Sequence, residues 1–159
     1  LLPNRVGGAV LQKNLETLGD IQYTQEEIDF ALELQRNNGK PEIGIDGKIR
    51  PLRETLNSPG GGSTDSGDVS YNVPVVSLAA TTAPKGVPWH SWSVVASSGM
   101  SIGHKGMLHA AKALGMTMVD IFKDSKLREN IKKEFDEKIG EYEYDPYLDP
   151  GPPPIDYVD

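Results

Sequence analysis

Three short segments of the sequence hold residue types that could bind a ligand or a metal ion. The first is the stretch 61–68, which reads Gly-Gly-Ser-Thr-Asp-Ser-Gly-Asp. Small residues let backbone N–H groups approach a carboxylate or phosphate, and the Asp65 and Asp68 side chains could orient a histidine or polarise a ligand. The alternative interpretation is a flexible turn. The stretch is not a P-loop, because no Gly-Lys-Ser/Thr follows it, and its acidic spacing is not that of a calcium-binding EF-hand loop.

The second segment is Trp89-His90-Ser91-Trp92. We expect it to lie in a loop that follows a buried strand, where a histidine is well placed to bind a metal ion. A neutral imidazole is a common ligand of zinc and manganese. The alternative is an ordinary loop histidine, either packed or exposed to solvent.

The third segment is the stretch 101–107, which reads Ser-Ile-Gly-His-Lys-Gly-Met. Ser101 could cap a long helix, and His104 would then lie in its first turn. The exposed N–H groups and the dipole at that end of a helix attract anions. His109 follows His104 by five residues, so the two side chains face different directions, and we expect His109 to be structural.

Composition excludes several classes of protein. The 159-residue chain has no cysteine, which rules out disulfides and thiolate metal sites and favours an intracellular home. Its net charge is −7 and its largest basic cluster is Lys132-Lys133, so it does not resemble a nucleic-acid-binding protein. No apolar run is long enough to cross a membrane. Three histidines that are spread over different elements, with no cysteine, do not build a closed metal centre, and no Gly-x-Ser-x-Gly motif supports a serine triad.

Hydrophobic spacing predicts the elements that must position these segments. A helix is expected over residues 5–18, capped by Asn4 and ended by Gly19. Thr24 and Glu27 predict a capping box that opens a second helix, which ends before Gly39 and buries one stripe. That stripe is formed by Ile28, Ala31 and Leu32.

The second half of the chain alternates between apolar segments and loops. Residues 73–80 are apolar and β-branched and predict a buried strand, residues 43–49 predict a short hairpin, and residues 81–101 predict a long loop. A long helix with an apolar face should follow through residue 122, and a further helix should cover 124–138. This order predicts an α/β fold, with the remaining strands of the sheet supplied by sequence outside the chain.

The motifs together resemble one known group. The stretch 62–70 (GSTDSGDVS), Val-Pro at 73–74, His-Ser-Trp at 90–92 and SIGHKGM at 101–107 resemble the aminobenzoyl-glutamate hydrolase group. This group belongs to the metal-dependent aminoacylase and carboxypeptidase family. The opening LLPN, the YTQEE at 23–27 and the proline-rich tail also fit, so the resemblance covers essentially the whole chain.

The resemblance implies a fold and a domain organisation. Residues 1–140 would be the C-terminal portion of a catalytic domain, a zinc-exopeptidase-like α/β sandwich whose N-terminal part and lid domain are absent from the chain. Residues 141–159 would form an acidic, proline-rich tail. The full-length enzyme would be cytoplasmic and would form a homodimer through the lid domain.

The resemblance also implies a chemistry. Two divalent ions, zinc or manganese, would serve a full-length amidohydrolase that cleaves N-acyl or N-aroyl amino acids such as aminobenzoyl-glutamate. His90 would be a metal ligand, whereas His104, Lys105 and Asp68 have no assigned role. The pocket that binds the small-molecule substrate would be lined by Gly62, Ser63, Thr64 and Asp65.

The other metal ligands and the glutamate base would lie outside the chain, in the rest of its own catalytic domain. We therefore expect the chain alone to hold no metal cofactor and to be inactive, with no catalytic residue of its own. The alternative is a non-catalytic α/β module that binds a partner through the loop of Trp89 and Trp92.

Overall fold

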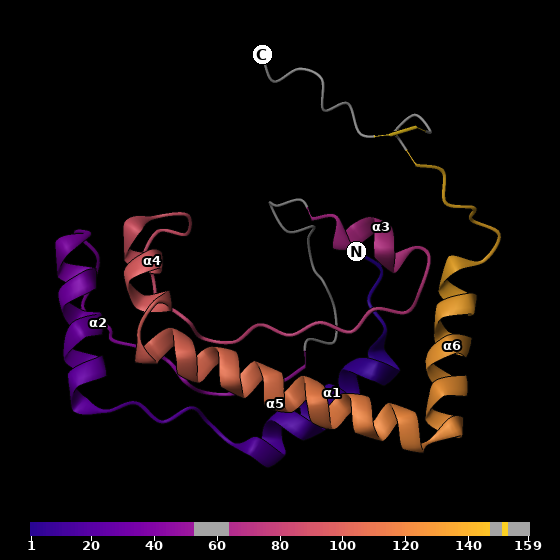
Figure 1. The fold of residues 1–159 in the computed structure, drawn as a ribbon, viewed down its shortest axis with the longest axis horizontal. Coiled ribbons are helices and arrows are strands. Elements are labelled where there is room, and N and C mark those ends of the chain that lie inside the picture. Colours follow the sequence, from indigo (N-terminus) through magenta and orange to yellow (C-terminus); the bar gives the residue numbers. More distant parts are fainter. Residues whose placement is uncertain (53–63, 147–150, 153–159) are drawn as a thin grey trace.

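The part of the chain that the structure describes is helical. The computed structural model describes residues 1–52, 64–146 and 151–152. In these ranges the helices are α1 (Arg5–Leu18), α2 (Gln25–Asn37), α3 (Ser66–Ser70), α4 (Trp92–Ser98), α5 (Ser101–Lys123) and α6 (Ser125–Ile139), as Figure 1 shows. None of these helices is both long and apolar enough to span a membrane.

The predicted α/β sandwich is wrong for this structure, because the described residues form no sheet. The segment 73–80 runs in an extended conformation, but its pairing is limited to an isolated parallel bridge between Pro3 and Val75. A strand becomes part of a sheet only where a neighbouring strand meets its N–H and C=O groups. The predicted buried strand is therefore also wrong, because residues 73–80 form no strand and Val73 is 50% exposed.

The predicted hairpin over residues 43–49 is also absent. This segment is irregular and is held by separate backbone bonds, from Ile21 N to Gly47 O and from Lys85 N to Gly44 O, 3.0 and 3.2 Å long. Gly47 permits the first contact, since a Cβ there would lie 2.1 Å from the Ile21 carbonyl oxygen. The segment is therefore hydrogen-bonded to the loop before α2 and to the loop before α4, and it does not pair with itself.

The long helices confirm the predicted capping residues. The Asn4 side chain accepts a hydrogen bond from the Gly7 N–H at the start of α1, and Gly19, with φ of 75°, ends it. Thr24 and Glu27 form the capping box of α2 as predicted, whereas the cap that the Asp124 carboxylate gives α6 was not predicted. In α5 the prediction was one residue out, because Met100 is the N-cap and Ser101 is the first helical residue.

Two short helices were not predicted. Helix α3 lies in the stretch that composition described as a turn, and α4 interrupts the predicted loop 81–101. Both are at most seven residues long, so neither shows the repeated apolar spacing from which a longer helix is recognised.

Helices α1 and α5 lie against each other and form the base of the molecule, with α2 and α6 at its two ends (Figure 1). The extended segment after α3 runs along α5 toward α4. Few apolar side chains are buried in the described ranges: Leu11, Ala31, Leu34, Val87, Ile102, Ala113 and Ile131. Buried polar groups therefore contribute much of the packing between helices.

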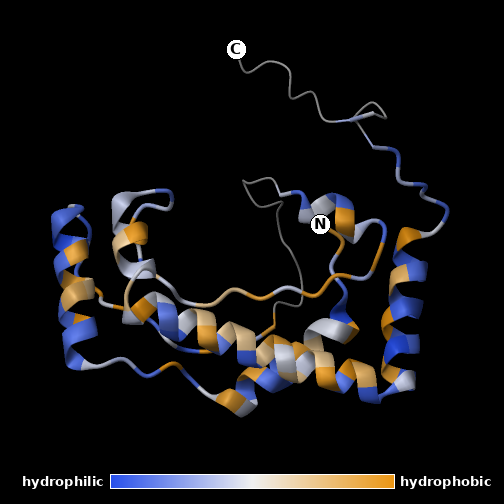
Figure 2. Cartoon of the chain, viewed as in Figure 1, coloured by the Kyte–Doolittle hydropathy of each residue, from blue (hydrophilic) through white to orange (hydrophobic). Residues whose placement is uncertain are grey.

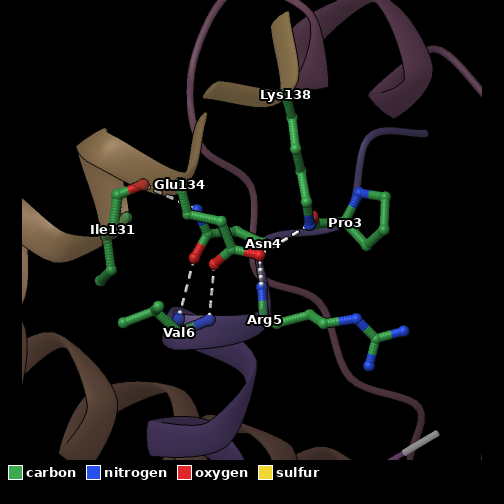
Figure 3. Close-up of polar contacts among 8 residues, drawn as sticks. Pro3, Asn4, Arg5, Val6, Ile131, Glu134 and Lys138 are labelled. Atoms are coloured by element: carbon green, nitrogen blue, oxygen red, sulfur yellow. Dashed lines mark hydrogen bonds and ion pairs between the residues drawn. The ribbon is translucent and has the colours of Figure 1, made fainter. Parts of the chain in front are cut away.

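One such polar cluster joins α1 to α6 (Figure 3). The Glu134 carboxylate accepts hydrogen bonds from the N–H groups of Arg5 and Val6, at 2.8 and 2.7 Å. The Asn4 side chain donates to the Ile131 carbonyl at 2.8 Å. Lys138 holds Glu134 at 2.6 Å. Because the first N–H groups of a helix have no partner within it, α6 supplies the acceptors that α1 needs.

Candidate functional site

The backbone of His90 adopts an unusual conformation. Its φ is +61°, and no other non-glycine residue among the described residues has a positive φ. This left-handed conformation is strained for most side chains, and histidine, asparagine and aspartate tolerate it better than others. Such strain persists where the surrounding structure holds it, and it is often found at functional positions.

Hydrogen bonds on both sides hold the His90 turn. Ser91, the N-cap residue of α4, donates its hydroxyl to the Pro88 carbonyl at 2.5 Å. Within α4, Ser93 is fully buried and accepts a hydrogen bond from the Asn38 side chain at 2.6 Å. This bond ties α4 to the end of α2. The first bond thus closes the turn on itself, and the second fixes the helix that follows it to α2.

The side chains around the turn are open to solvent. His90 is exposed, and Trp89 and Trp92 are 66% and 56% exposed, which is unusual for tryptophan in a packed protein. The imidazole of His90 has the donor chemistry that zinc or manganese requires. However, the described residues do not gather three or more histidine, cysteine, aspartate or glutamate side chains that could hold a metal ion. They supply one plausible ligand and do not complete a site.

The described end of the glycine-rich segment lies apart from His90. Gly62 and Ser63 lie outside the described residues, whereas Thr64 and Asp65 lead into α3 and are exposed. Figure 1 shows α3 beside the N-terminus, at the opposite end of the extended segment from α4. Since Asp65 is the N-cap of α3 and His90 precedes α4, this chain does not bring the two residues together.

Asp68 contacts the start of the tail. Its carboxylate is a hydrogen-bond partner of Tyr144, and the pKa of that phenol is raised by burial and then by Asp68. The neighbouring Tyr71 ring lies 5.2 Å from the Tyr142 ring, measured between centroids. Asp68 and Tyr71 therefore hold residues 142–144 against α3.

Lys105 has a clear structural role. Its Nζ atom lies 2.5 Å from the Glu27 carboxylate and donates to the Gln22 carbonyl at 2.9 Å. It also lies 5.5 Å from the centroid of the Tyr23 ring, close enough for a cation–π interaction. Lys105 therefore connects α5 to the loop and cap that begin α2.

The environment of Glu27 keeps its carboxylate ionised. Burial by itself would raise the pKa of this group, but hydrogen bonds from Lys105, the Ser101 hydroxyl and the Thr24 N–H outweigh that effect. Together they lower the pKa from 4.5 to about 2. The ion pair is thus the charged centre of the contact between α2 and α5, with the carboxylate only 5% exposed.

The Tyr23 hydroxyl beside this pair is buried and has no hydrogen-bond partner among the described residues. Burial, followed by the negative charges of Glu27 and Asp46, raises the pKa of this phenol to about 12. Tyr23 therefore stays neutral, and its ring serves as a packing surface for Lys105.

The other two histidines are separate from His90. His104 is exposed in the first turn of α5, and His109 is half-buried further along the same helix. His109 helps to line a groove of about 670 Å³ between α1 and two irregular segments. Those segments are 46–52 and 75–81. No hydrogen bond of either imidazole to a described residue is found, and neither lies in a candidate metal cluster there.

Sequence reasoning missed Gln35, which is fully buried. Its amide donates to the Gly44 and Lys85 carbonyls and accepts from the Gly44 N–H, each at 2.8 Å. The signal was a polar residue on the buried side of α2. It could not be interpreted without knowing which backbone groups would face it.

Comparison with known proteins identifies a related hydrolase. The chain is 33% identical over 157 residues to one subunit of the p-aminobenzoyl-glutamate hydrolase of Escherichia coli (strain K12), an alignment that covers 84% of this chain. The same alignment covers 33% of that protein, so the chain spans about a third of the length of the curated relative it matches. No protein-family model and no solved structure matches the chain.

This match confirms the resemblance that the motifs indicated: the chain is a relative of the aminobenzoyl-glutamate hydrolase group.

Proposed function

We propose that the chain is part of a metal-dependent amidohydrolase that cleaves N-acyl or N-aroyl amino acids such as aminobenzoyl-glutamate. The observation that carries this proposal is the match to a hydrolase subunit whose name states that substrate, over 84% of the chain. Since the chain spans only a third of that relative, we assign the activity to a full-length protein.

The second support is His90. An exposed imidazole on a strained turn that is fixed on both sides is suited to holding a metal ion in one position. Two divalent ions, zinc or manganese, would polarise the amide carbonyl and activate a water molecule for its hydrolysis. His90 would bind one of these ions through an imidazole nitrogen, and the remaining ligands and the glutamate base would come from the rest of the catalytic domain.

The other residues of the resemblance have supporting roles in this proposal. Gly62, Ser63, Thr64 and Asp65 would line the substrate pocket once the whole catalytic domain is present. Lys105 would position rather than react, because its ammonium group is already engaged by Glu27 and Gln22. His104, exposed at the start of α5, would be free to meet the rest of the domain.

The proposed enzyme acts in the cytoplasm, which fits the lack of cysteine in the chain. It forms a homodimer through its lid domain, as the resemblance implies. It is also one component of a larger hydrolase, because the relative is named as a subunit. The 159-residue chain alone should be inactive and hold no tightly bound metal.

The test is release of aminobenzoate from aminobenzoyl-glutamate by a full-length protein that carries this chain. The activity should disappear after treatment with a chelator and return with zinc or manganese. The 159-residue chain, assayed at the same concentration, should release none. Activity that survives complete removal of metal would contradict the metal-dependent mechanism, and turnover by the chain alone would contradict its assignment as part of an active site.

A second candidate function is a binding module without catalysis. The exposure of Trp89 and Trp92, together with Val95 at 73%, supports this alternative, because exposed aromatic residues are common anchors of interfaces. The same assay separates the two functions. A module would give no hydrolysis in the full-length protein, and its binding would fail when both tryptophans are replaced by alanine.

A further inference from the structure

Helix α5 packs against the rest of the chain through small residues. Gly103, Gly106, Ala113 and Thr117 are buried on this side. A Cβ at Gly106 would lie 2.2 Å from the Thr81 carbonyl oxygen, and one at Gly103 would lie 2.1 Å from the Ser98 carbonyl oxygen. The backbone of α5 therefore lies directly against neighbouring backbone at these two glycines, and Ile102 adds a fully buried apolar side chain near the start of the helix.

Six other large apolar side chains of α5 are exposed to solvent. We call them the α5 stripe, and they are between 40% and 75% exposed: Met107, Leu108, Leu114, Met118, Val119 and Phe122. Their spacing places them on one side of the helix, opposite Ala113 and Thr117. Figure 2 shows hydrophobic colouring along the length of α5. Monomeric proteins rarely expose a continuous apolar surface of this kind, which usually marks an interaction site.

We infer that the α5 stripe is the surface on which the remaining two-thirds of the full-length protein packs. The length of the relative supports this occupant, because the matched region is only 33% of it and the rest must contact the matched third somewhere. The small number of buried apolar residues in the described ranges supports the same occupant, because a core of this size gives only marginal stability by itself. The stripe follows α5 from Met107 to Phe122, so it fits another packed layer rather than a small molecule.

This inference rests on the proposed function only in placing the chain within a longer enzyme, and its test does not measure catalysis. The chain offers internal probes, because its methionines lie at different positions on and near α5. Met107 and Met118 lie in the α5 stripe and are 59% and 57% exposed, whereas Met116 lies toward the packed side and is half-buried. Peroxide oxidises exposed methionines, and mass spectrometry reads each site separately.

The experiment compares the 159-residue chain with a chimera in which this chain replaces the matched third of the E. coli protein. In the chimera, Met107 and Met118 should be oxidised at least about tenfold more slowly than in the chain alone, with a smaller change at Met116. Equal oxidation rates at Met107 and Met118 in the two proteins would overturn the inference. So would protection in the chain alone that increases with its concentration, because the occupant would then be a second copy.

If the chimera does not fold, a second measurement tests the same inference in the intact E. coli protein. Glutamates are introduced into the intact E. coli protein at the positions aligned with Met118 and Phe122, and Met118→Glu/Phe122→Glu is made in the 159-residue chain. The pair should lower the thermal midpoint of the E. coli protein by at least about 5 °C, because two charges would be buried there, and should change that of the chain by less than about 2 °C. An unchanged midpoint in the E. coli protein would overturn the inference.

Discussion

The Lys105 ammonium group lies 2.5 Å from the Glu27 carboxylate and thereby connects the beginnings of α5 and α2. Glu27 also completes the capping box of α2, in which it accepts a hydrogen bond from the Thr24 N–H at 2.7 Å. One buried carboxylate therefore serves two helices. The sequence predicted the capping box but not the lysine, because the two residues are 78 positions apart.

Replacing Glu27 should destabilise the chain. Glu27→Gln leaves the ammonium group of Lys105 without its partner and should lower the free energy of unfolding by roughly 2–3 kcal/mol. Urea unfolding followed by circular dichroism gives this value. Glu26→Gln, an exposed change in the same helical turn, is the matched control and should cost less than about 0.5 kcal/mol. Similar small losses in both variants would show that the ion pair contributes little.

The Glu27–Lys105 contact should also make stability depend on pH in a defined range. The folded-state pKa of Glu27 is about 2, below its ordinary value of 4.5, so the folded protein favours the ionised form. Its contribution is fully present above pH 4.5 and is lost as pH falls toward 2. The difference in thermal midpoint between the wild type and Glu27→Gln should therefore shrink as pH falls through this window. A difference that stays constant across the whole of it would contradict the lowered pKa.

Glu134 should stabilise α1 from outside that helix. Glu134→Ala removes the acceptor of the Arg5 and Val6 N–H groups and should lower the free energy of unfolding by about 1–2 kcal/mol. Chemical denaturation measures the loss. The control is Glu137→Ala, because Glu137 is exposed on the same helix and forms a loose ion pair with Lys133 at 3.8 Å. If both variants lose the same small amount, α6 does not cap α1.

The Gln35 amide should be needed for its hydrogen bonds rather than its volume. Gln35→Leu is similar in size but leaves the Gly44 N–H and the Lys85 carbonyl without their partner, while the Gly44 carbonyl keeps only its bond from the Lys85 N–H, so we expect a loss of about 2–4 kcal/mol. Thermal unfolding of this variant is compared with that of Gln25→Leu, an exposed change in the same helix. A Gln35→Leu protein as stable as the wild type would mean that these backbone groups find water instead.

The sequence predicted what local spacing and capping determine. The N-caps Asn4 and Thr24 and the terminal Gly19 are local signals, and the helices that they bound are present. It failed where the outcome depends on distant partners. The apolar composition of 73–80 predicted a buried strand, but a strand forms and is buried only against neighbouring strands, which the described chain does not supply.

The candidate site shows the same division. The type and loop position of His90 could be read from the sequence, whereas its left-handed backbone and its ties to α2 could not. Lys105 stood out by its motif, but its partner Glu27 was visible only after folding. Gly62 and Ser63 lie outside the described residues, so their place in a substrate pocket stays a prediction.

The assignment of His90 as a metal ligand is tested most directly by comparing two histidine variants in a full-length protein that carries this chain. His90→Asn and His109→Asn remove the same imidazole group, and asparagine tolerates the left-handed backbone at position 90, so backbone strain does not confound the comparison. We expect His90→Asn to lower aminobenzoate release by at least about 100-fold and to reduce bound metal, measured by mass spectrometry, with the thermal midpoint of the metal-free protein unchanged. His109→Asn should keep both activity and metal. Equal, mild losses in the two variants would contradict the assignment.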